Sequence, residues 1–402
     1  MTGPASPTSW VPKDVYHRVV ELRRALHRHP ELSWQEQATS DLVVTTLSSL
    51  GLSPRTGIAG TGVLADLPGI SKGPLVALRA DMDALPIQEA TGLPFQSEHA
   101  GVMHACGHDL HMATLLGAAM LLTREKALPT PVRFIFQPAE ETGAGARELI
   151  EHGALEHVGM IFGAHVDLRH DPGQIVVHEG TVNASTDEFT ITLSGPGGHA
   201  ARPHESVDPI VAAGFLLTEL QSLVSRRLPP SEPAVVTVGR IEGGTAPNIL
   251  ASRLRLDGTL RAHTQETRQR LIHDVQDTAA AVGSAHGVAV ETTIQGGTPP
   301  VVNGGQGITV CREAARRTVG PDGIRVLDVP NMGGEDFGYY LERVPGAFVR
   351  FGARPADRDV GPAHSSRFDA DELVLAMGAR FFAEAAMLAG LELSTARKAS
   401  GR

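Results

Sequence analysis

The chain has 402 residues, of which 42% are hydrophobic, 4% are aromatic and 20% are charged, and its formal net charge at pH 7 is −10. This length favours two domains, and this hydrophobic content excludes a disordered chain. The negative charge, the scarcity of aromatic residues and the lack of a block rich in Lys and Arg argue against nucleic acid as a partner.

Neither a secretion signal nor a membrane helix is expected. Residues 1–10 are polar and rich in proline, without the charged and then apolar pattern of a signal peptide. No apolar run reaches the roughly 20 residues that are needed to cross a bilayer. The two cysteines, Cys106 and Cys311, are too few for a disulfide framework. We therefore expect a cytoplasmic protein without a membrane partner.

Two helices are predicted near the N-terminus, at 11–29 and 36–50. The first has apolar residues spaced to form one buried face: Val15, Val19, Leu22 and Leu26. Pro30 ends this helix, because proline disfavours the helical conformation at the residue before it. Gly51 closes the second helix.

Short apolar runs followed by polar side chains then recur along the chain. The runs cover residues 75–78, 132–136, 160–164 and 347–351. Helical patterns at 108–123 and 143–152 separate the first three, and this alternation indicates an α/β fold with a mostly parallel central sheet. Because ligands of such sheets bind beyond the carboxyl ends of the strands, we expect the polar residues that follow the runs to meet at one edge: Asp81, Asp83, Glu140, Glu141, His165, Asp167 and His364.

The segment 184–297 has a different pattern. Its first strand, predicted at 186–194, alternates apolar and polar residues as a half-exposed strand does. A helix, two strands, a helix and a last strand are predicted at 207–226, 234–241, 252–262, 264–283 and 287–294. This βαββαβ order is that of the ferredoxin-like unit. We therefore predict that 184–297 is an α+β domain inserted into an outer domain, which is formed by 11–183 and 298–392 and completed by helices at about 304–318 and 370–389.

Residues 104–111 contain three histidines, one cysteine and one aspartate. Cys106 and His108 can reach one ion from a loop, and thiolate and imidazole suit zinc, manganese, cobalt or nickel. Together with Glu141, His165 and His364, they provide donors for two divalent metal ions. The alternative is that Cys106 is a small buried residue and that the histidines are solvated or lie in the core.

The adjacent Glu140 and Glu141 fit a division of roles, in which one glutamate binds metal and the other stays free as general base and acid. Their spacing leaves open which is which, and the alternative for such a pair is a solvated helix start. Asp83 is predicted to hydrogen-bond a ligating histidine, and Asp81 either does the same or caps a turn.

Five segments carry a family resemblance: RADMDALP at 79–86, HACGHDLH at 104–111, QPAEE at 137–141, GPGGHA at 195–200 and MGGEDF at 332–337. They resemble the M20 metallopeptidase family, and within it the amidohydrolase branch of N-acyl-amino-acid, hippurate and indole-acetyl-amino-acid hydrolases. The resemblance spans about residues 14–390. It implies a zinc-peptidase-like catalytic domain with a binuclear metal site, and an inserted lid domain through which the chain forms a homodimer.

The resemblance also implies roles for individual residues. The family's metal ligands are matched by Cys106, His108, Glu141, His165 and His364. Glu140 matches the general base, and His199 matches a histidine that reaches the oxyanion from the lid of a partner subunit. Substrate-binding residues are matched by Asn248, Arg261 and Gly334. Asp81 stands where many peptidase members have a metal-binding histidine, and this departure favours amidohydrolase over dipeptidase activity.

The predicted function is metal-dependent hydrolysis of the amide bond of N-acyl-L-amino acids. The substrates would be N-acetyl, benzoyl or aryl-acetyl conjugates, and the products a carboxylate and a free amino acid. One alternative is a dipeptidase or a deacetylase of the N-acetyl-diaminopimelate type that uses the same site. Another is a non-catalytic relative that binds a metal or a ligand, although such a protein has no need of a free base.

Overall fold

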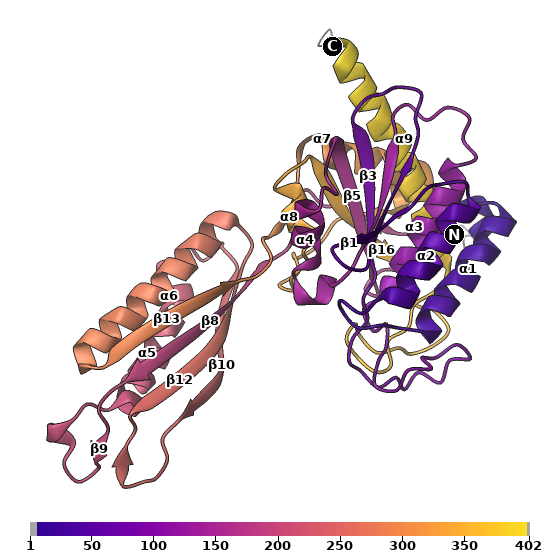
Figure 1. Cartoon of the computed structure of the whole chain (residues 1–402). Coiled ribbons are helices and arrows are strands. Elements are labelled where there is room, and N and C mark those ends of the chain that lie inside the picture. The colour runs from indigo at the N-terminus through magenta and orange to yellow at the C-terminus, as the bar shows by residue number, and fades with distance from the viewer. Residues whose placement is uncertain (1–5, 400–402) are drawn as a thin grey trace. The chain divides into compact units, whose positions relative to one another are not determined.

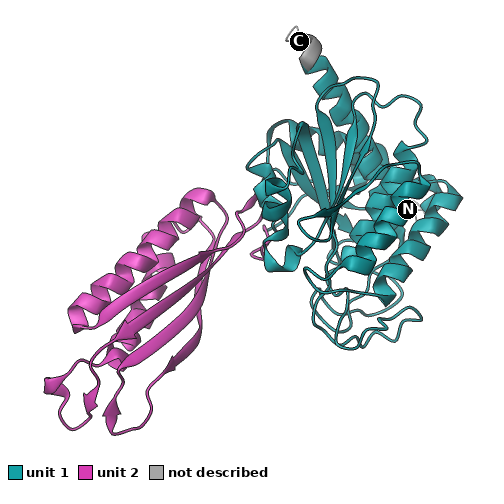
Figure 2. Cartoon of the chain, viewed as in Figure 1, with its two compact units in different colours: residues 1–182, 302–329, 336–402 teal, residues 183–301, 330–335 magenta. Residues whose placement is uncertain are grey.

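The structure, a computed structural model, describes residues 6–399. Residues 1–5, the first half of the segment in which no signal peptide is expected, lie outside the described residues. The chain forms two compact units (Figure 1, Figure 2). Unit 1 consists of the chain up to Val182, of Val302–Val329 and of the chain from Asp336 onward. Unit 2 consists of Asn183–Val301 and Pro330–Glu335. The assignment of catalytic and lid domains stays a prediction.

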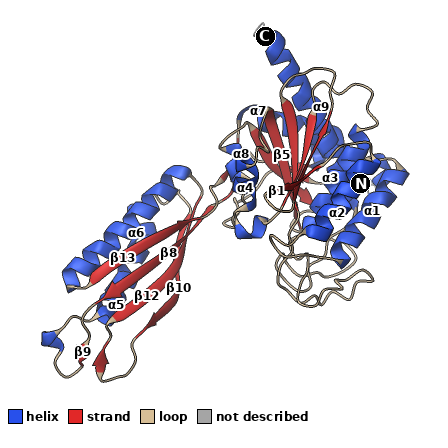
Figure 3. Ribbon diagram, in the orientation of Figure 1, coloured by secondary structure: helices blue, strands red, loops and turns tan. Residues whose placement is uncertain are grey.

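A sheet with the order β1-β2-β4-β3-β5-β16-β6-β15 forms the centre of unit 1 (Figure 3). Its strands are β1 (Arg55–Ile58), β2 (Gly62–Leu67), β3 (Leu75–Asp81), β4 (Val132–Gln137), β5 (Val158–Asp167), β6 (Ile175–Val176), β15 (Ile324–Arg325) and β16 (Gly346–Gly352). The neighbours β4, β3, β5 and β16 run parallel, as the apolar runs predict. The antiparallel hairpin of β1 and β2, which extends the sheet beyond β4, is not among the predicted elements.

Helices cover both faces of this sheet. One face packs against α2 (Gln37–Ser49), α3 (His108–Leu122), α7 (Gly305–Val319) and α9 (Leu373–Ala399), and α1 (Lys13–Arg28) packs on α3 and α9. The short helices α4 (Gly145–Glu151) and α8 (Gly338–Leu341) lie against the other face. There Phe337 packs on Gly163 of β5, where a β-carbon would come within 2.6 Å of the phenyl ring.

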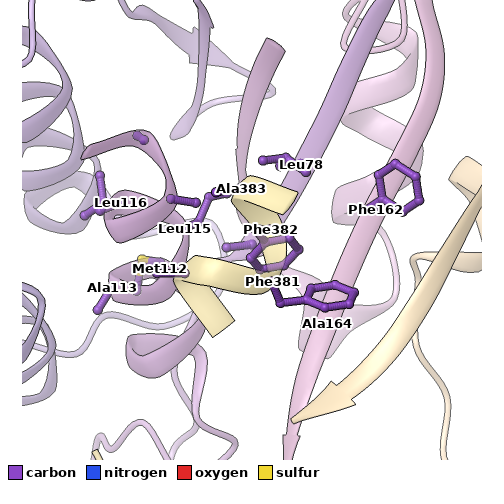
Figure 4. Close-up of a cluster of buried hydrophobic side chains, with 14 of the residues drawn as sticks. Leu78, Met112, Ala113, Leu115, Leu116, Phe162, Ala164, Phe381, Phe382 and Ala383 are labelled. Atoms are coloured by element: carbon purple, nitrogen blue, oxygen red, sulfur yellow. The ribbon is translucent and has the colours of Figure 1, made fainter. Parts of the chain in front are cut away.

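The main hydrophobic core lies between the sheet and helices α3 and α9. Figure 4 shows Leu78 and Phe162 of the sheet near Leu115 of α3 and Phe381 of α9. Helix α3 is buried along its whole length except at Leu121. Helix α9 is apolar and long enough to cross a bilayer, but 72% of its most apolar stretch is buried in the protein, as expected for a core helix. The start of α3 therefore rests on a rigid core.

Unit 2 has a separate hydrophobic core beneath a second sheet. Its main elements are β8 (Ser185–Ser194), α5 (Pro209–Ser222), β10 (Ala234–Gly243), β12 (Arg253–Ala262), α6 (Gln265–His286) and β13 (Ala289–Gly296). The sheet has the antiparallel order β10-β12-β8-β13, which is the ferredoxin-like arrangement that the βαββαβ pattern predicts. The predicted helix 207–226 is α5 plus a π-helical turn at Leu223–Arg227.

The described residues also form two small two-stranded sheets. In one, β9 (Gly198–His199) pairs with β11 (Ile249–Leu250) in unit 2. In the other, β7 (Gly180–Asn183) pairs with β14 (Val301–Asn303), at two of the four points where the chain passes from one unit to the other. Both are too short to leave a periodic pattern in the sequence.

Candidate metal centre

The five side chains that were expected to bind metal come together at the carboxyl ends of the parallel strands. Cys106, His108 and His165 each offer a donor atom within 4.8 Å of the others, and so do Cys106, Glu141 and His364. A third such group joins His108 to Glu140 and Glu141. Because these groups share members, the side chains form one cluster, which we call the donor cluster. Their roles as ligands and base stay predictions.

Each donor is placed by a neighbouring element. His165 lies near the end of β5, and the 3-10 turn Glu140–Thr142 follows β4. Cys106 and His108 flank Gly107, which has a φ of 95° and where a β-carbon would lie 2.6 Å from the side chain of Val166. Only glycine fits such a position without strain.

The loop after β16 carries His364, and it is joined to the Cys106 loop through the backbone. The amide of His364 donates a hydrogen bond of 2.8 Å to the carbonyl of Ala105. His364 itself has a φ of 65°, in the left-handed region that non-glycine residues rarely occupy. A strained residue that is tied to the loop of a predicted ligand is the kind of feature found at functional sites.

Two of the histidines are oriented by backbone carbonyls. His108 Nδ1 donates to the carbonyl of Asp83 at 2.8 Å, and His165 Nδ1 donates to that of Val166 at 2.7 Å. The protons on Nδ1 leave the Nε2 atoms of both rings as the potential metal donors. His165 Nε2 lies 3.2 Å from Cys106 Sγ, and His108 Nε2 lies 3.8 Å from Glu141 Oε1.

The residues present fit a pair of divalent cations. Among the described residues, His108 Nε2 and Glu141 Oε1 are buried atoms without a hydrogen-bond partner. An unsatisfied buried polar atom costs about 1–3 kcal/mol, and a cation between these atoms would remove that cost. A thiol, imidazoles and carboxylates are the donor set of zinc and related transition metals.

The side chains of the donor cluster have shifted pKa values, and these shifts bear on cation binding. Burial raises the pKa of the Cys106 thiol to about 12, and burial lowers that of His165 well below its usual range. Burial also opposes a proton on His108, but Asp81 and Cys106 outweigh it and raise the pKa of His108. The nearby carboxylate of Glu141 raises the pKa of His364. Since ligands bind cations in their deprotonated forms, cation binding here would release protons.

Asp83 acts on both parts of the cluster. Its backbone carbonyl accepts the bond from His108, while its carboxylate oxygen Oδ1 lies 3.4 Å from the same ring nitrogen. The two carboxylate oxygens accept the amides of Glu140 and Glu141, each at 3.0 Å. The hydroxyl of Ser33 donates a further bond of 2.7 Å. Asp83 therefore shapes the turn that carries the two glutamates.

His111 lies beside the cluster but has no nitrogen free for a cation. Its Nδ1 donates to Asp81 Oδ1 at 2.7 Å, and its Nε2 accepts the amide of Val166 at 3.0 Å. Asp81 in turn accepts a bond of 2.7 Å from Arg79. The group of Asp81, His108 and His111 is therefore a hydrogen-bonded support and not a third ion site. The signal for this support in the sequence is the spacing of three residues between His108 and His111, which places both on one face of a helix.

The remaining predicted residues lie in unit 2. His199 lies in β9, and Asn248 directly precedes β11; the amide of Ala200 donates to the carbonyl of Asn248 at 3.1 Å. The exposed ring of His199 accepts the amide of Ala201 at Nδ1, so that the neutral ring carries its proton on Nε2. Arg261 lies half-buried in β12. Gly334 belongs to the piece Pro330–Glu335.

Comparison with known proteins gives close relatives over the full fold. The chain is 41% identical to the N-acetylcysteine deacetylase of Bacillus subtilis over 381 residues, which are 94% of this chain and 98% of that protein. It is 39% identical to the IAA-amino acid hydrolase ILR1-like 2 of Arabidopsis thaliana over 378 residues, which are 93% of this chain and 85% of that protein.

A solved structure is similarly close. The crystal structure of the YXEP protein of Bacillus subtilis, described as a dinuclear metal binding peptidase from the M20 family, superposes with a TM-score of 0.84. The two are 37% identical, and the match covers 95% of this chain and 99% of the other. The relatives confirm the predicted fold class and the predicted hydrolase class. Residues 77–388 match the model of peptidase family M20/M25/M40, and the chain belongs to this family.

Proposed function

We propose that this protein is a metal-dependent amidohydrolase that cleaves the amide bond of N-acyl-L-amino acids, with N-acetyl, benzoyl or aryl-acetyl groups as candidates for the acyl part. The observation that carries the proposal is a second carboxylate, Glu140, beside a full set of metal donors. The names of the deacetylase and the IAA-amino acid hydrolase support this substrate class.

Five side chains are proposed to hold two divalent ions, zinc or manganese with cobalt or nickel also suited: Cys106, His108, Glu141, His165 and His364. Ions bound there would lower the pKa of a coordinated water and polarise the acyl carbonyl. Glu140 would take a proton from the attacking water and give it to the leaving amine. His199 would donate a hydrogen bond to the oxyanion, with its proton already on Nε2.

The substrate's own carboxylate needs a cationic partner. We assign this role to Arg261, since a guanidinium can bind a carboxylate with two parallel hydrogen bonds. Asn248 and Gly334 would contact the same end of the substrate. These three assignments rest on the family resemblance.

Two contacts support Glu141 as the ligand and Glu140 as the base. Glu141 Oε1 lies 3.4 Å from His364 Nε2 and is a buried atom without a hydrogen-bond partner among the described residues. Glu141 also shares a donor group with Cys106, which Glu140 does not. A glutamate held among ligands is suited to bind cations, and its neighbour can then act as the group that moves a proton.

The test is Glu140→Gln, which keeps the shape and removes the base. We expect two ions per chain and a loss of kcat of about 100-fold to 10,000-fold, the usual contribution of a general base. Metal content by plasma mass spectrometry and hydrolysis of N-acetyl amino acids would be measured together. The matched control is Glu151→Gln on the exposed end of α4. Near-normal turnover in the Glu140 variant would refute the assignment.

A substrate panel separates the alternatives. Hippurate and N-acetyl amino acids should be cleaved faster than dipeptides or N-acetyl-diaminopimelate. Faster cleavage of dipeptides would favour the peptidase alternative, although Asp81 stands where many peptidase members have a histidine. No amine release from any acyl substrate, with metal present, would favour a non-catalytic binding protein.

We further propose a homodimer formed through unit 2, in a reducing cytoplasmic setting. Large apolar side chains are exposed on α5 and on β10, an edge strand of the second sheet: Ile210, Val211, Phe215 and Ile241. Exposed apolar side chains beside an open strand edge favour association with another chain. Both cysteines are free thiols, and Cys106 can bind metal only while it stays reduced.

A further inference from the structure

Glu36 is a buried carboxylate to which the proposed reaction gives no role. It precedes helix α2, and none of its surface is exposed. One carboxylate oxygen, Oε2, accepts the hydroxyl of Thr61 at 2.7 Å. The other, Oε1, accepts the amide of Ala139 at 2.9 Å. Thr61 precedes β2 and Ala139 follows β4, so that one side chain joins three separate segments.

Ala139 is the residue on which the turn of Glu140 and Glu141 depends. Its φ of 54° and ψ of 41° lie in the left-handed region, which is unfavourable for any residue with a β-carbon. Ala139 is also fully buried, so water cannot satisfy its amide. The bond to Glu36 therefore stabilises the conformation that directs the chain from β4 into the catalytic turn.

Asp83 holds the next two amides of the turn in the way that Glu36 holds the amide of Ala139. The amides of residues 139, 140 and 141 point at buried carboxylates, the first at Glu36 and the other two at Asp83. Successive amides that start from a left-handed residue form a concave site for acceptor oxygens, and here the acceptors are carboxylate side chains of the protein. The backbone that carries Glu140 is thus held from two sides.

We propose that Glu36 is a positioning residue for Glu140, because its carboxylate holds Ala139 in the left-handed conformation and so sets the direction from which Glu140 reaches the reacting water. This inference rests on the proposed function, in which Glu140 is the base. The contribution of Glu36 is its hydrogen-bond geometry and not its charge. Burial raises the pKa of Glu36, because a buried site disfavours the ionised form of a carboxyl group.

The first test compares two substitutions. Glu36→Met removes both acceptors at similar side-chain length, and we expect kcat to fall by about 10-fold to 100-fold, as for other residues that orient catalytic groups. KM and the content of two ions should stay close to those of the wild type. Glu36→Gln keeps a carbonyl oxygen for the amide of Ala139, so its kcat should lie within about threefold of the wild type on the same scale.

A matched control is a glutamate that also contacts the start of α2. Glu31 accepts the amides of Ala38 and Thr39 at the start of α2, but it has no bond to residues 139–141 among the described contacts. Glu31→Met should therefore lower the stability of the fold in a similar way and leave kcat unchanged. An equal loss of kcat in both variants would mean that α2 acts only through stability, and the proposal would be wrong.

A second substitution tests the conformation itself. Glycine adopts the left-handed region freely, so Ala139→Gly should make the support of Glu36 less necessary. The double variant Glu36→Met with Ala139→Gly should regain part of the lost kcat, although it removes a buried methyl group. A kcat lower than that of Glu36→Met alone would overturn the proposal.

Amide hydrogen exchange gives a readout that does not depend on turnover. Exchange at residues 139–141 should become faster in Glu36→Met and stay slow in Glu31→Met. If Glu36→Met does not fold, Thr61→Val weakens the same support by removing one hydrogen bond to Glu36, and it should show a smaller change in the same direction. Unchanged exchange would refute the positioning role, whereas a wild type without metal-dependent hydrolysis would refute only the proposed function.

Discussion

The histidines around the donor cluster differ in what their two ring nitrogens contact. His108 and His165 each use Nδ1 for a backbone carbonyl and leave Nε2 within the cluster. His111 uses both nitrogens, for Asp81 and for the amide of Val166. Since a coordinated imidazole needs an available lone pair, this difference separates the two proposed ligands from the histidine that supports them.

Metal content should follow this difference. His165→Gln removes a donor and should leave fewer than two ions per chain after dialysis. His111→Gln should retain two ions, with an affinity lowered by about 10-fold to 100-fold at most, because it disturbs only a neighbour of the ligands. Plasma mass spectrometry on the dialysed variants is the measurement. A full loss of one ion from the His111 variant would make it a ligand and contradict the structure.

The carboxylate of Asp83 accepts two backbone amides, and we therefore expect that substitution of Asp83 lowers activity. In Asp83→Asn a single carbonyl oxygen remains for the amides of Glu140 and Glu141, and the new amide group repels one of them. We expect kcat to fall by about 10-fold to 100-fold with little change in KM. Ser33→Ala removes only the hydroxyl bond to Asp83 and should cost much less. Equal losses in steady-state kinetics would contradict this explanation.

Among the elements, helices α1 and α3 are joined by buried charges. Arg23 and His27 of α1 both bond Asp109 Oδ2 at 2.9 Å, one residue beyond His108. Arg23 also bonds Asp369, in the segment before α9, at 3.0 Å. Loss of one partner from such a buried set typically costs about 3–5 kcal/mol, because the other charges stay buried without compensation.

His27 makes this connection dependent on pH. Burial opposes its proton, but Asp109 and Glu89 outweigh burial and raise the pKa of His27. A group whose pKa is raised by folding stabilises the fold below its unfolded pKa, about 6.5, and this contribution is lost as the pH rises through the folded value. The carboxyl of Asp109 has a lowered pKa, so its own contribution stays constant above pH 6.

The expected result concerns the difference in the free energy of unfolding between the wild type and His27→Gln. This difference should be on the order of 3 kcal/mol at pH 6 and should decrease toward pH 9. Urea unfolding in the presence of a chelator is the measurement, because bound ions would add their own pH dependence. A difference that increases with pH would mean that His27 is neutral in the fold.

The elements that were predicted correctly are those with a strong pattern. Strands β3, β4 and β16 are buried on both faces and appear in the sequence as continuous apolar runs. The hairpin of β1 and β2 was missed, because β1 is largely exposed and its turn contains Ala59 at a φ of 49°. Strands β6 and β15 have two residues each, too few for any periodicity.

At the donor cluster too, only residues in distinctive sequence segments could be predicted. Its cysteine, histidines and glutamates lie in segments distinctive enough to be recognised from sequence, and the parallel strands explain why they converge. Glu36 gave no such signal, because a glutamate before a helix is usually a solvated first-turn acid. Its partner Ala139 lies 103 residues away, so that only the folded chain reveals the contact.

At the scale of the whole molecule, unit 2 carries the exposed apolar side chains through which we propose that the chain dimerises. Phe215 on α5 is 57% exposed, and Ile241 on the edge strand β10 is 49% exposed. Phe215→Glu should cost the isolated chain little stability, since the side chain is already largely in water. It should weaken a dimer about 10-fold or more by sedimentation, because a charge would be buried in the interface. Val326→Glu, at a 62% exposed position of unit 1, is the control.

The predicted role of His199 in a partner's reaction can be tested by mixing two inactive variants. Glu140→Gln keeps His199, and His199→Ala keeps Glu140. If His199 acts across the dimer, each hybrid contains one site with both residues intact, and an equal mixture should regain about a quarter of the wild-type kcat. The Phe215→Glu background should abolish this recovery. Hybrids that form, as shown by mass spectrometry, without any recovery would mean that His199 acts within its own chain or not at all.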